Sequence, residues 1–166
     1  IQRHYKNFTS MSWVYSCGAG ANYGTALESA LKMGETIHIP SCCYEIEEYI
    51  HGPNLQLTPQ YNVIFFDGND SASRRVEQVY KATRKVSNRA YLISNNPQLS
   101  SDDHVLSLSD TVSSELCPLV YLPFVQLLSF IVSNDLHSIY QHPLLKEFKA
   151  IAAAKTENFV NYDGDD

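Results

Sequence analysis

Short apolar runs without polar alternation are the feature of this chain that most constrains its fold. The clearest run is NVIFF at residues 62–66, and such a run is typical of a parallel strand that helices cover on both faces. Asp67 and Gly68 end this run, and a helical pattern follows at about 72–86. A strand followed at once by an amphipathic helix is the repeating unit of parallel α/β sheets.

The same unit recurs along the chain. Four further strands are predicted at residues 13–17, 37–40, 90–93 and 105–108. Helices are predicted after the first strand, at 44–50 and at 119–133, the last being a strongly apolar segment that we expect to be buried. We therefore expect an α/β fold, a three-layer αβα sandwich with a five-stranded, mostly parallel sheet.

The length of the chain fits one domain. Its 166 residues, 44% of them hydrophobic, are enough for a single well-formed core. Residues 1–12 are expected to be the end of an upstream linker or helix, 13–145 the domain, and 146–166 a carboxyl-terminal tail. Because position 1 is not methionine, we expect the chain to be part of a longer protein.

Charge and hydropathy exclude several classes of partner. The net charge is −6 and no run of lysine or arginine is present, so neither nucleic acid nor a membrane surface is expected as a partner. The net charge does not exclude a small anionic substrate, because backbone N–H groups can hold a phosphate in an acidic protein. The sequence has no signal-peptide pattern and no run of roughly 18 apolar residues, so a cytoplasmic protein is expected.

The cysteines form neither a CxxC pair nor a Cys/His metal-binding spacing. Neither a metal site nor a cofactor is therefore expected from them. They are expected to be reduced and mostly buried, as small apolar side chains usually are in a chain of this size. They are Cys17, Cys42, Cys43 and Cys117.

Three charged residues share one face of the first long helix. Glu28, Lys32 and Glu35 fall at i, i+4 and i+7, which places them on one side of the helix. One interpretation is an ordinary solvated face with a Glu–Lys pair. The other is a site, because this helix starts at the carboxyl edge of a strand, where ligands bind in open α/β folds. Its last turn points away from that edge, so Glu35 is expected to serve a site shared with a neighbouring chain.

A histidine follows the short acidic helix. His51 lies between Glu48 and the Gly52–Pro53 pair, where a side chain can be held without being buried. A lone loop histidine is usually just a surface residue. Its imidazole nevertheless titrates near neutral pH, which suits a group that donates and recovers a proton.

The turn after the first strand is a weak signal for anion binding. Its backbone N–H groups at Gly18, Gly20 and Asn22 could hold an anion at the start of the helix. The GxGxxG spacing of dinucleotide sites is not met, because Tyr23 occupies the last glycine position. No GxSxG nucleophile elbow is present either.

Four segments together resemble one family. They are GAGANYGTALESALKMGE, EEYIHGPNLQL, YLPFVQLLSFIV and the AKT near the end of the chain. They are similar to the SIS (sugar isomerase) domain of glucosamine-6-phosphate synthase and of the related fructosamine 6-phosphate deglycases, with the patterns GxGxxYxxALExALKxxE, ExxHGP and PxxQLL. The resemblance implies a flavodoxin-like SIS fold and a sugar 6-phosphate substrate.

The resemblance also implies roles for individual residues. Glu35 would be the base that moves a proton between C1 and C2 of the open-chain sugar. His51 would open the sugar ring. Lys32 and Glu28 would support this geometry, and Glu48 would orient the histidine loop.

Two features depart from the family pattern. Lys155 would lie near the sugar carbonyl, but the tail reads AAAKTENF where the synthase has LAKSVT. The Ser/Thr-rich phosphate loop, SxSGxT, belongs to an amino-terminal sister SIS domain and has no counterpart in this chain. The chain alone is therefore expected to be catalytically incomplete, with that sister domain and further copies in a homo-oligomer as its partners.

The CCYEIEEYIHGPNLQLTP segment looks more like the deglycases than the synthase. This implies a ketosamine (fructosamine-type) 6-phosphate substrate that is enolised and then releases an amine and glucose 6-phosphate. The alternatives are the isomerase domain of a glutamine–fructose-6-phosphate aminotransferase and a non-catalytic module that binds sugar phosphates.

Overall fold

A five-stranded sheet forms the centre of the computed structural model, which describes residues 1–108, 112–138 and 151. Every pair of neighbouring strands is parallel. In spatial order the strands are β2 (Ser41–Glu45), β1 (Val14–Gly18), β3 (Asn62–Phe66), β4 (Ala90–Ser94) and β5 (Val105–Ser107). The predicted five-stranded α/β sheet is thus confirmed.

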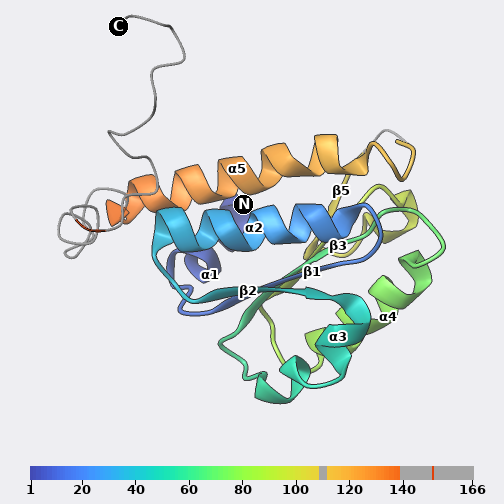
Figure 1. Cartoon of the computed structure of the whole chain (residues 1–166), viewed down its shortest axis with the longest axis horizontal. Coiled ribbons are helices and arrows are strands. Elements are labelled where there is room, and N and C mark those ends of the chain that lie inside the picture. The colour runs from blue at the N-terminus through green and yellow to red at the C-terminus, as the bar shows by residue number, and fades with distance from the viewer. Residues whose placement is uncertain (109–111, 139–150, 152–166) are drawn as a thin grey trace, which may run out of the picture.

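Helices cover both faces of this sheet (Figure 1). One face carries α1 (Tyr5–Thr9), α2 (Asn22–Ile37) and α5 (Cys117–Asp135), and the other carries α3 (Ile46–Ile50) and α4 (Ser73–Arg84). Short 3-10 turns complete the described elements: η1 (Gln2–His4), η2 (Pro53–Gln56) and η3 (Pro97–Leu99).

Two hydrophobic cores explain why β3 is apolar throughout. Val63 and Phe65 point into the core under α3 and α4, whereas Ile64 and Phe66 point into the core under α2 and α5. All four side chains are fully buried. A central strand of a covered sheet has no solvent face, so no polar alternation is left in its sequence.

Helix α5 buries only one of its faces in the core. The expectation that this apolar segment is buried is therefore only partly right, because Leu119, Leu127 and Phe130 are exposed. Among the described residues it is the one helix whose length and apolar composition would allow it to cross a bilayer. Here it packs against α2 (Figure 1). Its side chains Tyr121, Val125 and Leu128 are buried in the core. Pro123 is accommodated inside the helix.

The strand predicted at 37–40 is wrong. Helix α2 continues through Ile37 and ends at His38, whose backbone is left-handed (φ 62). The Pro40 carbonyl already accepts a hydrogen bond from Val14 N (3.2 Å), and β2 begins only at the next residue. As an edge strand, β2 is only partly buried, so its residues SCCYE lack the continuous apolar run of β3.

The short acidic helix accordingly starts at Ile46 rather than 44. The Glu45 side chain caps it by accepting a hydrogen bond from Glu47 N (2.6 Å). Glu48 reaches back to accept one from Glu45 N (3.2 Å). This reciprocal capping box explains the side chains of Glu45 and Glu48 without invoking a substrate.

The cysteines are free, as predicted, but only half of them are buried. Cys17 and Cys117 lie in the cores, where burial raises the pKa of both thiols. Cys42 is exposed and Cys43 partly so, because both lie on the edge strand β2.

Candidate functional site

The strand order places a topological switch point at the carboxyl ends of β1 and β3. From β1 the chain crosses through α2 to β2 on one side, and it then returns to β3 on the other side of β1. Ligands of open α/β folds bind at such a switch point. We call the region between the turn 18–22 and the turn 67–70, which follow β1 and β3, the crevice.

Carboxylates occupy the β3 side of this crevice. Asp67 is 1% exposed, and its two oxygens accept hydrogen bonds from Ser94 Oγ (2.7 Å) and Asn69 N (3.0 Å). Asp70 Oδ1 accepts from Ala72 N (2.8 Å). Asp70 Oδ2 lies against the other turn, 3.0 Å from where a Cβ on residue 20 would sit. A phosphate at this turn would meet a carboxylate, so the crevice does not suit an anion.

An amide donor remains available in the same crevice. Asn22 is fully buried, and its Oδ1 accepts a hydrogen bond from Thr25 Oγ1 (3.0 Å). Its Nδ2 has no hydrogen-bond partner among the described residues and lies 3.0 Å from where a Cβ on Gly68 would sit. The approach of the two turns therefore leaves a buried N–H group for a neutral or carbonyl-type acceptor.

The predicted face of α2 forms a connected line of charges. Lys32 Nζ lies 2.8 Å from Glu35 Oε2 and 3.5 Å from Glu28 Oε1. The hydrogen bond to Glu35 is the main reason that the pKa of Lys32 is raised. The prediction that the three side chains share one face is confirmed. Helix α2 starts at the carboxyl ends of the strands and runs toward their amino ends. Glu35 lies in its last turn and is therefore far from the crevice.

His51 ends α3 on the other face of the sheet. Its side chain is exposed, and its backbone N–H donates to the Glu48 carbonyl (3.1 Å). The Glu48 carboxylate is engaged in the capping box, so this residue holds the loop through its main chain as well as its side chain. The chain then turns at Gly52, whose carbonyl accepts from Leu55 N (2.9 Å).

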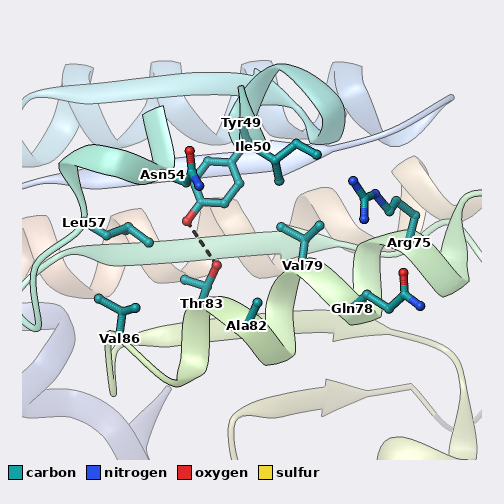
Figure 2. A pocket seen from close by; sticks show the side chains of 10 residues that line it. All are labelled: Tyr49, Ile50, Asn54, Leu57, Arg75, Gln78, Val79, Ala82, Thr83 and Val86. Atoms are coloured by element: carbon teal, nitrogen blue, oxygen red, sulfur yellow. Dashed lines mark hydrogen bonds between the residues drawn. The ribbon is translucent and has the colours of Figure 1, made fainter. Parts of the chain in front are cut away.

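A cleft of about 340 Å³ lies behind the His51 loop, between α3 and α4 (Figure 2). Tyr49 and Thr83 join its two walls through a hydroxyl hydrogen bond of 3.1 Å. Asn54 Oδ1 is buried there with no hydrogen-bond partner in the described part of the chain. At the far end Arg75 binds Glu47 through two hydrogen bonds (2.7 and 3.1 Å), which lower the pKa of Glu47.

This cleft is not predicted by any sequence motif. Its walls come from residues 49–57 and 75–86, which only the fold brings together. A local signal did exist on α4, because its lining residues follow helical i, i+3, i+4 spacing. They are Arg75, Gln78, Val79, Ala82, Thr83 and Val86.

The structure does not bring all the predicted site residues together. Glu28, Lys32 and Glu35 lie on the α2 side of the sheet, Glu48 and His51 on the α3 side, and Gly18, Gly20 and Asn22 at the crevice between β1 and β3. Lys155 lies outside the described residues.

Apolar side chains are exposed on the helical layer that carries Glu35. They come from both α2 and α5, which lie side by side (Figure 1). The exposed large residues on these two helices are Leu27, Leu31, Leu119, Val120, Leu127 and Phe130. Apolar surface of this extent is typical of an interaction face.

Comparison with known proteins places this arrangement in a family. A profile described as SIS domain matches residues 9–111. The isomerizing glutamine–fructose-6-phosphate aminotransferase of Methanothermobacter thermautotrophicus is 30% identical over 131 residues, which are 76% of this chain and 22% of that protein. The enzyme of the same name from Xylella fastidiosa (strain Temecula1) is 28% identical over 125 residues, 74% of this chain and 20% of that protein. The chain thus spans about a fifth of these relatives.

Solved structures share the fold. A proposed phosphosugar isomerase from Clostridium difficile 630 superposes with a TM-score of 0.78 at 20% identity, covering 93% of this chain and 43% of that one. The C-terminal domain of glucosamine-fructose-6-phosphate aminotransferase from Francisella tularensis gives a TM-score of 0.67 at 23% identity, covering 80% of this chain and 38% of that one. The matched profile covers more than half of the residues: this chain belongs to the SIS domain family.

Proposed function

We propose that this chain is one SIS half of a phosphosugar enzyme and that Glu35 is its proton-transfer base. The observation that carries this proposal is the line of Glu28, Lys32 and Glu35, in which the Lys32 ammonium is hydrogen-bonded to the Glu35 carboxylate at 2.8 Å. A positioned carboxylate with a fixed cationic neighbour can take a proton from a carbon next to a carbonyl. Glu35 is half exposed, so a substrate held by another domain or subunit can reach it.

The proposed substrate is a ketosamine 6-phosphate. Glu35 would remove a proton from C1, which carries the amine nitrogen, and the C2 carbonyl would become the hydroxyl of an enaminol. Return of the proton to C2 would give an aldimine at C1. Water would then add to the C=N bond and release glucose 6-phosphate and the free amine, with no change in overall oxidation state.

The remaining predicted residues would act around this step. His51 would protonate and open the sugar ring, with Glu48 holding its loop through the contacts described above. Lys155 would lie near the sugar carbonyl. Gly18, Gly20 and Asn22 would support a substrate that meets the Glu35 of another copy, because the crevice lies at the far end of α2 from the chain's own Glu35. There the buried Asn22 Nδ2 can meet a neutral oxygen.

A sister SIS domain would bind the phosphate. This is supported by the carboxylates of Asp67 and Asp70 in the crevice of this chain and by the greater length of the relatives. The exposed apolar side chains of α2 and α5 would lie under that domain or under a second copy in a homo-oligomer.

The second candidate is the isomerase domain of a glutamine–fructose-6-phosphate aminotransferase. It is favoured by the names of the curated relatives, which are 24–30% identical. A non-catalytic sugar-phosphate-binding module is the third candidate. Such a module needs no proton-transfer base. A finding that Glu35 is essential for turnover would therefore argue against it.

One experiment separates the three. The full-length protein is incubated either with a ketosamine 6-phosphate, or with fructose 6-phosphate and glutamine, and products are followed by NMR. Release of glucose 6-phosphate and amine from the first substrate supports the deglycase. Formation of glucosamine 6-phosphate from the second supports the aminotransferase and overturns the deglycase. Binding without turnover of either would leave the non-catalytic module.

A further inference from the structure

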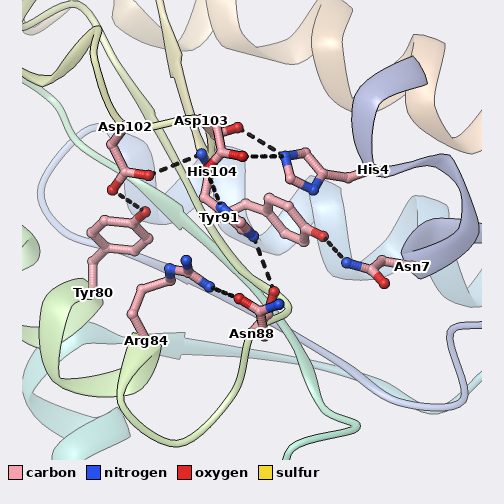
Figure 3. Close-up of polar contacts among 9 residues, drawn as sticks. All are labelled: His4, Asn7, Tyr80, Arg84, Asn88, Tyr91, Asp102, Asp103 and His104. Carbon is pink, nitrogen blue, oxygen red and sulfur yellow. Dashed lines mark hydrogen bonds and ion pairs between the residues drawn. The ribbon is translucent and has the colours of Figure 1, made fainter.

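Three side chains of metal-ligand type meet where the N-terminal segment contacts the loop before β5 (Figure 3). His4 comes from η1, and Asp103 and His104 lie directly before β5. Their ligand atoms all lie within 4.8 Å of one another. The cluster is separate from the Glu35 face, the His51 loop and the crevice between β1 and β3.

The hydrogen bonds of His104 leave one ring nitrogen facing a carboxylate. Its Nε2 lies 3.1 Å from the Asn88 carbonyl oxygen, which can only accept, so Nε2 carries the proton and donates. Its Nδ1 lies 2.7 Å from Asp103 Oδ1. This Nδ1 and the Asp103 carboxylate therefore face each other as two groups of metal-ligand type.

The neighbouring groups hold both imidazoles in place. The His4 and His104 rings are 4.2 Å apart between centroids, and Tyr91 stacks on His104 at 5.2 Å. The Tyr91 hydroxyl is fixed in turn by Asn7 Nδ2 (2.9 Å). The His104 side chain is 7% exposed, whereas Asp103 is 58% exposed, so solvent ions have access to the carboxylate side.

We propose that His4 Nε2, the Asp103 carboxylate and His104 Nδ1 form a zinc(II)-class cation site, with water completing a tetrahedron. Two imidazoles and a carboxylate are a ligand set that zinc accepts. The hydrogen bond from His104 Nε2 to the Asn88 carbonyl then leaves Nδ1 as the nitrogen that can bind the metal. Metal-binding histidines usually have such a hydrogen bond on their second nitrogen.

Modest rearrangement closes the site. Bonds of about 2.0–2.1 Å in a tetrahedron set neighbouring ligand atoms about 3.3 Å apart. The 2.7 Å contact of His104 with Asp103 has to widen, and the 4.0 Å separation of His4 Nε2 from Asp103 Oδ2 has to shorten. His4 Nε2 now lies 2.8 Å from the Asp103 carbonyl oxygen, so its proton must move to Nδ1. Arg3 is a nearby positive charge that would weaken binding.

The ion would tie η1 to the edge of the sheet. His4 and Asp103 are 99 residues apart in sequence, so no local spacing motif marks the site. Such a tie stabilises the folded chain by the free energy of metal binding, because the separated ligands of the unfolded chain bind the ion less well.

The test uses the untagged full chain, stripped with a chelator and then dialysed against zinc(II). We expect about one zinc per chain by atomic emission, a cobalt(II) visible spectrum of tetrahedral type, and a melting temperature that rises with zinc. Asp103→Asn keeps the shape of an exposed side chain and should fold. It and His4→Ala should bind zinc at least about tenfold more weakly and lose the rise.

His137→Asn is the matched control. This histidine is exposed and has left-handed backbone (φ 51), which asparagine tolerates. It should bind zinc as the wild type does. Absence of zinc from the stripped and reloaded wild type would overturn the proposal and leave the contact between His104 and Asp103 as a hydrogen bond within the fold. Equal zinc content in the wild type and both ligand variants would also overturn it, since the ion would then be held elsewhere.

Discussion

Glu35 and His51 lie on opposite faces of the sheet, Glu35 on α2 and His51 at the end of α3 (Figure 1). The buried residues of α2 belong to the core shared with α5, and those of α3 to the core shared with α4. A base and a ring-opening acid must each come within about 3 Å of one substrate. One copy of this domain cannot provide both, if both act on the same sugar.

This separation predicts an active site shared between subunits. The active full-length protein should be at least a dimer by light scattering. Mixing inactive Glu35→Gln and His51→Ala variants under exchange conditions should form hybrids with one intact site, and about a quarter of the wild-type activity is expected from random pairing in a two-fold dimer. An active monomer at assay concentration would contradict the shared site.

Loss of the proposed base should reduce turnover more than binding. Glu35→Gln in the full-length enzyme keeps the size of the side chain and its contact with Lys32, and kcat should fall at least about a hundredfold with KM little changed. Glu77→Gln is the control, because Glu77 also pairs with a lysine, Lys81 (3.0 Å), but on α4. Turnover of the Glu35 variant near that of the control would remove Glu35 from the mechanism.

The elements whose sequence signal is local were predicted well. β3 was predicted to the residue because burial on both faces leaves it fully apolar. The charged face of α2 was predicted because i, i+4, i+7 spacing is a property of one helix. β2 was misplaced because an edge strand is only partly buried, and because Ile37 and Ile39 gave 37–40 an apolar appearance.

Sites that depend on tertiary contacts were not predicted. The cleft behind His51 and the cluster of His4, Asp103 and His104 join segments far apart in sequence. The acidic lining of the crevice depends on how closely the turn at Asp70 approaches the turn at Gly20, which follows only from the strand order.

The carboxylates at the crevice predict poor phosphate binding by the isolated chain. Asp67 is buried and Asp70 lies against the Gly20 turn, so a phosphate there would be repelled. Calorimetry with glucose 6-phosphate should detect binding to the full-length protein and little or none to this chain. Tight binding to the chain alone would show that the turn after β1 holds the phosphate and that no sister domain is needed.

Two glycines near the start of α2 should respond in opposite ways to alanine. A Cβ on Gly18 would collide with the backbone carbonyl oxygen of Asn22 and lie 2.9 Å from its carbonyl carbon. Backbone atoms cannot move aside as the end of a side chain can, so Gly18→Ala should lower the free energy of unfolding by about 1–3 kcal/mol, the usual range for overpacking.

A Cβ on Gly24 meets nothing within 4 Å, and this residue is helical. Gly24→Ala should therefore raise stability by up to about 1 kcal/mol through helix propensity. Urea unfolding of both variants measures the difference. If Gly18→Ala is as stable as the wild type, the turn between β1 and α2 is wider at the Asn22 carbonyl than described, and a side chain at residue 18 is not overpacked.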